Sequence, residues 1–201
     1  MKNDYKVIVD AGHGGTDPGA VGNNILEKDL NLRAAKYMYK RLQELNIPSV
    51  IIRDKDEDLP KNERIKRVLE AYNNEPNTIL ISNHINAGGG EGAEIVYALR
   101  NNSTLADITL QNIGEVGQLK RKVYQRRLPE NPNLDYYYIL RESGQNTEPI
   151  LIEYGFIDCE TVFGDGTHQK ANANKNKHKD VEVEIVKKVY VSRCCAVACQ
   201  C

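Results

Sequence analysis

The chain of 201 residues contains no tryptophan and only two phenylalanines, although tyrosine occurs eleven times. It also lacks an excess of either charge, because 27 lysines and arginines against 28 aspartates and glutamates leave a net charge of −1. Binding to nucleic acid is driven largely by a basic surface that neutralises phosphates. We therefore expect no nucleic-acid partner.

Long apolar runs are missing as well, so the sequence predicts no integral membrane segment. No secretory signal precedes the first apolar stretch at residues 7–9. We therefore expect a protein that is made in the cytoplasm. A target outside the cell would have to be reached by a route other than a signal peptide.

Cysteine is absent from the first 158 residues, and four of the five cysteines lie in the last eight. The main part of the fold is therefore expected not to depend on disulfides. Residues 164–179 are rich in Asn, Lys and Gly without an apolar period, which is typical of a loop or of disorder. Residues 181–191 could form one closing helix or a strand. These features separate a domain at 1–158 from an atypical tail at 159–201.

Within the first 158 residues, apolar segments alternate with amphipathic helical patterns. Strands are expected at residues 7–9, 49–53, 78–84, 92–99, 136–141 and 149–154. Helices are expected at residues 27–45, 61–72 and about 104–122, and a surface loop at 126–135. Such alternation indicates an α/β fold in a single domain, with a mostly parallel twisted sheet flanked by helices.

The first apolar strand ends in a glycine-rich loop that carries His13. The glycines at residues 12–22 let the backbone turn sharply and leave space beside the imidazole. A phosphate-binding loop is excluded, because no Gly-Lys-Ser/Thr follows. Open α/β sheets place their sites at the carboxyl ends of strands, so His13 is a candidate ligand or acid/base group. The alternative is a loop histidine that only packs.

Two later apolar strands also end in a polar residue, His84 and Glu153, and Glu27 opens the first helix. Two histidines and a carboxylate are a recognised ligand set for catalytic zinc, with water at the open position. A second carboxylate, not bound to the metal, can then transfer protons. Together the residue types favour a metal-dependent hydrolase.

Each of these residues also has a purely structural interpretation. Glu27 could simply favour the positive end of its helix. His84 could be a buried histidine satisfied by backbone groups. Glu153 is harder to explain in this way, because a carboxylate at the end of a core strand is costly unless it is paired or functional.

Four segments resemble the motifs of the zinc-dependent N-acetylmuramoyl-L-alanine amidases of the amidase 3 family, which cleave bacterial peptidoglycan. In chain order these segments are Asp10–Ala20, Leu26–Leu32, Ser82–Ala87 and Leu151–Ile157. The resemblance extends from about residue 6 to residue 157. It covers most of the domain and leaves out the tail.

The resemblance implies that His13, Glu27 and His84 bind one zinc ion and that Glu153 is the catalytic carboxylate. It also implies that Arg141 lies where such enzymes often carry a positive group near the substrate, although a surface arginine is the alternative. Residues 1–158 would then be the catalytic domain. The substrate would be peptidoglycan, cleaved between N-acetylmuramic acid and the L-alanine of the stem peptide.

Two other functions stay open at this point: a zinc peptidase that acts on the stem peptide, and a muropeptide-binding module without activity. As a cell-wall hydrolase without a signal peptide, the protein would be an endolysin released through a phage-type pore or an autolysin freed by lysis. The tail departs from the family pattern and is expected to contribute little to catalysis. A second metal site that uses His168 or His178 is an alternative role for it.

Overall fold

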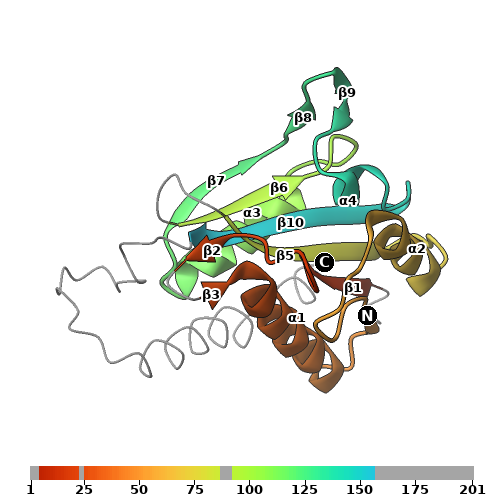
Figure 1. Ribbon diagram of the computed structural model, residues 1–201. Coiled ribbons are helices and arrows are strands. Elements are labelled where there is room, and N and C mark those ends of the chain that lie inside the picture. The colour runs from red at the N-terminus through yellow and green to blue at the C-terminus, as the bar shows by residue number, and fades with distance from the viewer. Residues whose placement is uncertain (1–4, 23–24, 87–91, 157–201) are drawn as a thin grey trace, which may run out of the picture.

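The computed structural model describes residues 5–22, 25–86 and 92–156. Its centre is a six-stranded sheet with the order β4-β1-β5-β10-β6-β7 (Figure 1). The strands are β1 (Lys6–Ala11), β4 (Ser49–Ile51), β5 (Thr78–Asn86), β6 (Ala93–Tyr97), β7 (Lys120–Tyr124) and β10 (Thr147–Phe156). The first four strands in the sheet order run parallel, and β6 and β7 run in the opposite direction. The expected α/β fold with a mostly parallel sheet is confirmed.

Helices cover both faces of this sheet. Apolar residues of β1 alternate between the two faces, so that Val7 packs in one core cluster and Ile8 in the other. Because both faces are buried, the parallel strands are apolar nearly throughout. The first cluster includes residues of α1 (Glu27–Glu44) and α3 (Thr104–Glu115), and the second includes residues of α2 (Lys61–Ala71) and α4 (Tyr138–Arg141).

The face that carries α2 and α4 becomes polar toward the carboxyl ends of the parallel strands. His84 of β5 is in register with Glu153 of β10, and Glu153 in turn pairs with Glu94 of β6. Two residues earlier, Ser82 of β5 pairs with Asp10 of β1. Since alternate residues of a strand share a face, these side chains form a polar surface at one edge of the sheet.

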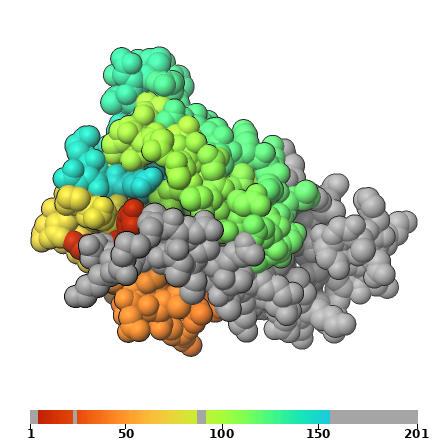
Figure 2. Space-filling view, turned by 180° about the vertical axis from the view of Figure 1, so that it is seen from behind, coloured from red at the N-terminus to blue at the C-terminus, as the bar shows by residue number. Residues whose placement is uncertain are grey.

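Two short hairpins lie outside the main sheet. One joins β2 (Val21–Gly22) to β3 (Ile25–Leu26), and the other joins β8 (Arg127–Leu128) to β9 (Asn131–Asp135). The β8–β9 hairpin projects from the body of the protein in both views (Figure 1, Figure 2). It corrects the expectation of a loop at residues 126–135. The prediction took Pro132 as a sign of a loop, because proline cannot donate a backbone hydrogen bond. Both strands of a two-stranded hairpin are edge strands, where a missing N–H is tolerated.

Two further expectations were wrong in their details. Residues 136–141 do not form a strand, because Tyr138–Arg141 is the single-turn helix α4. Within this helix, the consecutive residues Ile139 and Leu140 are both buried in the same core cluster. In a strand, two consecutive side chains would point to opposite faces. The third helix ends at Glu115 rather than near residue 122, because Gly117 adopts a φ of 101° and the chain then continues into β7.

The expectations for the tail lie outside the described residues. They include the closing element at residues 181–191 and the alternative metal ligands His168 and His178. Among the helices that the structure describes, none is both long and apolar enough to cross a membrane.

Candidate metal centre

The loop after β1 holds His13 in an unusual conformation. Its φ of 62° lies in the left-handed region, which residues other than glycine seldom adopt. The backbone N–H of Gly12 donates to the carbonyl of Asn83 at 3.0 Å, and the Arg64 guanidinium donates to the His13 carbonyl at 2.8 Å. A Cβ added at Gly12 would overlap the ring of His84. The loop therefore needs glycine at this position, since the two segments approach so closely.

Two buried arginines hold this loop in place by hydrogen bonds to its backbone carbonyls. Arg53 Nε donates to the Ala11 carbonyl at 2.9 Å, and its Nη2 donates to the Lys28 carbonyl in the first turn of α1, also at 2.9 Å. Arg64 Nη1 contacts the carboxylate of Asp10 and donates to the same Ala11 carbonyl at 2.7 Å. The arginines thus tie the loop to the helix that begins with Glu27.

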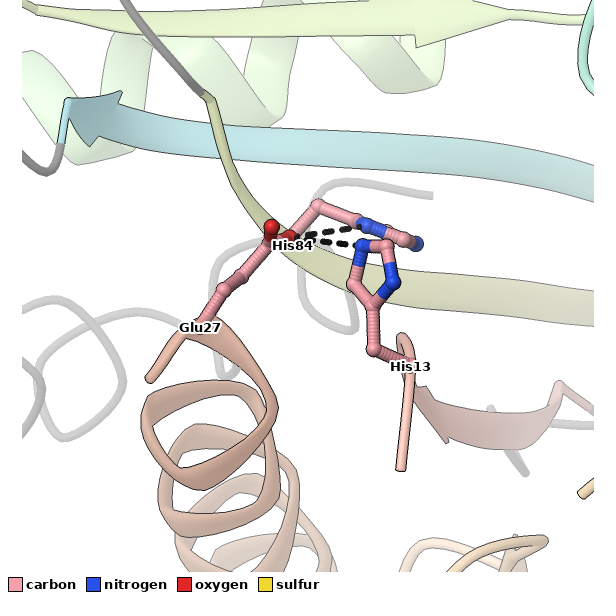
Figure 3. A group of neighbouring side chains, drawn as sticks. All are labelled: His13, Glu27 and His84. Carbon is pink, nitrogen blue, oxygen red and sulfur yellow. Dashed lines mark hydrogen bonds and ion pairs between the residues drawn. The ribbon is translucent and has the colours of Figure 1, made fainter. Parts of the chain in front are cut away.

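The carboxylate of Glu27 faces both histidines (Figure 3). Its Oε1 is 3.2 Å from His13 Nε2 and 3.1 Å from His84 Nδ1. One donor atom from each of the three side chains lies within 4.8 Å of the others. The structure therefore brings together all three residues that were predicted as metal ligands, and their donor atoms could hold one metal ion.

Neighbouring groups orient these side chains. Asp17 Oδ2 lies 2.8 Å from His13 Nδ1, and because a carboxylate only accepts, Nδ1 carries a proton and Nε2 is the nitrogen that faces Glu27. Asn31 Nδ2 donates to Glu27 Oε1 at 3.1 Å, and the Ala20 N–H donates to Glu27 Oε2 at 2.8 Å. Metal-binding histidines and carboxylates are commonly held by such outer partners.

Within this cluster, Glu27 and His13 each stabilise the charged form of the other. Burial alone would raise the pKa of Glu27, but hydrogen bonds from His13 and His84 hold that pKa far below its usual range. Burial alone would lower the pKa of His13, but the contacts with Glu27 and Asp17 raise it from 6.5 to about 9. Glu27 is therefore an ionised carboxylate, and a cation fits the position where the two imidazoles converge on it.

Glu153 lies beside the cluster, in register with His84. Its side chain is buried, and among the described residues its Oε2 has no hydrogen-bond partner. Burial raises the pKa of this carboxyl from 4.5 to about 7, and the negative charge of Glu27 adds to the rise while His84 opposes it. A buried carboxyl group with a near-neutral pKa next to a metal-binding cluster is suited to proton transfer.

Arg141 is not part of this arrangement. It ends α4, where its guanidinium donates to the backbone carbonyl of Asp135 and to Glu142 Oε1, the latter at 3.1 Å. It is also not among the residues that line the cavity described next. Its predicted place near the substrate stays a prediction.

A cavity of about 360 Å³ adjoins the cluster on the face of the sheet that carries α2 and α4. His13 and His84 line it, together with Lys61 of α2 and Tyr137 and Tyr138 at the start of α4. The sequence analysis did not identify the last three residues as part of a site. The run of tyrosines was the available signal, but residues 136–141 were expected to form a strand.

The comparisons with known proteins agree with this geometry. The model of the family described as N-acetylmuramoyl-L-alanine amidase matches residues 7–188. The uncharacterised protein YqiI of Bacillus subtilis (strain 168) is 31% identical over 176 residues, which cover 82% of this chain and 78% of that protein. The sporulation-specific N-acetylmuramoyl-L-alanine amidase of the same organism is 31% identical over 156 residues, which cover 76% of this chain.

The alignment spans only 56% of the length of that sporulation amidase. Among solved structures, an N-acetylmuramoyl-L-alanine amidase from Clostridium difficile 630 matches with a TM-score of 0.71 and 23% identity, and the match covers 100% of both chains. This structural likeness shows the fold.

Proposed function

Because the chain belongs to the N-acetylmuramoyl-L-alanine amidase family, we propose that it is a zinc-dependent peptidoglycan hydrolase. The bond cleaved would be the amide between the lactyl group of N-acetylmuramic acid and the L-alanine of the stem peptide. The observation that carries this proposal is the convergence of His13, Glu27 and His84 beside the buried carboxyl of Glu153. The proposed site of action is the bacterial cell wall.

We assign the metal to His13, Glu27 and His84. Imidazole nitrogen and carboxylate oxygen are usual zinc ligands, and three protein ligands leave the open position of a catalytic site. The ionised state of Glu27 and the Nδ1 proton of His13 favour this donor set. When bound, zinc would supply a Lewis acid that polarises the amide carbonyl and lowers the pKa of water.

Glu153 would act as the acid/base residue. Its buried Oε2 has no partner among the described residues, so it is available to take a proton from the attacking water. It would then deliver that proton to the alanine nitrogen as the C–N bond breaks. The products are a free lactyl carboxyl on the sugar and a stem peptide with a free amino terminus.

Mass spectrometry of digested peptidoglycan tests the reaction. The proposal predicts release of intact stem peptides that begin with L-alanine. Shortened stem peptides would instead indicate a zinc peptidase, and the absence of any product would indicate a binding module. Either of these results would overturn the proposed reaction.

Two substitutions separate the roles of the site residues. Glu153→Gln should keep one zinc ion per chain in elemental analysis and lower turnover by roughly 10²–10⁴-fold, because it removes proton transfer but no ligand. His84→Ala should lose tightly bound zinc. A Glu153→Gln protein that turns over at the parental rate would remove Glu153 from the mechanism, and a His84→Ala protein with full zinc content would refute the ligand assignment.

A further inference from the structure

The strand β7 lies at one edge of the six-stranded sheet, and it is strongly basic. It leads directly into the projecting β8–β9 hairpin (Figure 1). Residues 116–129 include no aspartate or glutamate. The cations of this segment are all exposed, and they are Lys120, Arg121, Lys122, Arg126 and Arg127. A local positive charge therefore stands out on a chain whose net charge is −1.

One of these cations is balanced by a buried carboxylate. Glu94 of β6 is 3% exposed, and its Oε1 lies 2.5 Å from Nη1 of Arg121. The Nζ of Lys122 is farther away, at 3.8 Å from Glu94 Oε2, and the Lys122 side chain is 53% exposed. We therefore leave Arg121 aside. The other four cations are called the basic edge: Lys120, Lys122, Arg126 and Arg127.

The two lysines of the basic edge are held by uncharged groups. Lys120 Nζ donates to the side-chain oxygen of Gln111 on α3 at 2.7 Å. Lys122 Nζ lies 4.2 Å from the centre of the Tyr124 ring. Such contacts hold each ammonium in place without cancelling its charge.

The two arginines are held in the same way. The guanidinium of Arg126 lies 3.8 Å from the centre of the Tyr136 ring and donates to the hydroxyl of Tyr137 at 3.2 Å. Arg127 donates to the backbone carbonyl of Pro132 at 2.6 Å. Each of these hydrogen bonds uses one of the five N–H donors of a guanidinium. Donors therefore remain for an anion, and their planar fork suits a phosphate.

The basic edge is arranged for a long anion rather than a small one. At about 3.3 Å per residue, β7 alone spans roughly 13 Å. Lys120 reaches α3 on one face of the sheet, whereas Lys122 is in register with Glu94 on the face that carries the metal cluster. Cations that are spread along an edge and over both faces do not converge on one point. They can be contacted together by a linear polymer that carries repeated negative charges.

Cross-strand register places the basic edge near the metal cluster without overlap. His84 of β5 pairs with Glu153, Glu153 pairs with Glu94, and Glu94 pairs with Lys122. Three steps of about 4.8 Å put Lys122 roughly 14 Å from His84 along this row. A polymer on the basic edge would therefore leave the cavity beside the histidines accessible.

Charged residues on an edge strand can also serve to prevent pairing with another chain. The opposite edge of the described sheet does not use this device, because β4 has the sequence Ser-Val-Ile. Protection of a sheet edge in this protein thus does not require cations. This difference between the two edges favours a binding role for the basic one.

We propose that the basic edge binds a linear polymer of polyol units joined by phosphodiesters, a type of polyanion that occurs in bacterial cell walls. The choice of a wall polymer rests on the proposed function, which places the protein at the cell wall. Contact with such a polymer would hold the protein beside its substrate and raise the effective concentration of the site.

Binding to poly(glycerol phosphate) tests this inference. Affinity is measured by calorimetry on the zinc-loaded protein over a series of salt concentrations. The test variant combines Lys120→Gln, Lys122→Gln and Arg127→Gln, and it keeps Arg126 because that residue contacts Tyr137 at the cavity wall. At about 0.15 M salt the variant should bind roughly tenfold or more weakly than the parental protein. Its slope of log K against log salt should be smaller by about 2, since each contact with a flexible strand contributes about 0.7.

The matched control removes the same charge from exposed positions of α1 and α2. It combines Lys36→Gln, Lys40→Gln and Lys66→Gln. This control should bind the polymer within about twofold of the parental affinity, because its cations lie outside the basic edge. Thermal melting checks the fold of both variants. Both should cleave a small soluble muramyl peptide at the parental rate, since the polymer is absent from that assay.

Three results would overturn the inference. The parental protein could fail to bind the polymer, or the test variant could bind it as tightly as the control, which would leave edge protection as the role of the cations. Equal or tighter binding of polyglutamate or single-stranded DNA would refute the polyol phosphate as the preferred partner. Polymer binding by a protein that cleaves no muramyl peptide would support this surface and refute the proposed reaction, so the two claims are tested separately.

Discussion

Replacing Glu153 with glutamine should stabilise the metal-free protein at pH 8, and most of this gain should disappear at pH 5. The Glu153 side chain is 7% exposed, and its Oε2 has no hydrogen-bond partner among the described residues. Burial raises the pKa of its carboxyl from 4.5 to about 7. Ionisation therefore costs more free energy in the folded protein than in the unfolded chain.

The direction of the pH dependence follows from the order of the two pKa values. When the folded pKa of a carboxyl lies above its unfolded pKa, its contribution to stability is full below the unfolded value, here about 4.5. That contribution is lost as the pH rises through about 7. The raised pKa corresponds to about 3 kcal/mol of unfolding free energy. Glutamine has the same shape and no charge, so the variant escapes this loss.

Thermal unfolding followed by circular dichroism in the presence of a chelator measures the effect. For a chain of this size, about 3 kcal/mol corresponds to a difference in Tm of about 6–12 °C at pH 8. The control Glu70→Gln, which removes the same charge from an exposed position of α2, should change the Tm only slightly. The reasoning is wrong if Glu153→Gln changes the Tm equally at pH 5 and pH 8, or if it lowers the Tm at pH 8.

Two other substitutions test the support of the metal site. Arg53→Lys should weaken zinc binding by about tenfold or more in competition with a chelator, because one ammonium cannot replace the fork of donors that holds the Ala11 and Lys28 carbonyls. An unchanged zinc affinity would show that Arg53 serves folding alone. Gly12→Ala should also weaken zinc binding by at least tenfold, since the added methyl displaces the His84 ring, and a fully retained zinc affinity would contradict this close approach.

The metal cluster could be predicted because each of its residues stands next to a strong local signal. His13 follows an apolar strand and a glycine, and His84 lies near the end of another such strand. In a parallel sheet the carboxyl ends of neighbouring strands meet at one edge. From the alternation of strands and helices, it could therefore be predicted that these two histidines lie close together. The family resemblance then added Glu27 as a ligand.

The cavity and its supports could not be predicted in the same way. Residues 136–141 have no helical period, and one turn of helix forms there only because Ile139 and Leu140 pack into the core. Arg53 and Arg64 look like surface residues in the sequence. Their burial depends on carbonyl groups of a loop about forty to fifty residues away along the chain, which only the folded structure brings within reach.

The two glutamates of the site illustrate the same limit. Glu27 accepts hydrogen bonds from Ala20, Asn31 and a backbone N–H of β5, and both histidines hold its pKa low, so it is a permanent anion suited to a cation. Glu153 has a buried oxygen without a partner among the described residues, and its pKa is near neutral, so it can gain and lose a proton. Nothing in either residue type separates these roles. The separation arises from donors that tertiary structure supplies to one carboxylate and withholds from the other.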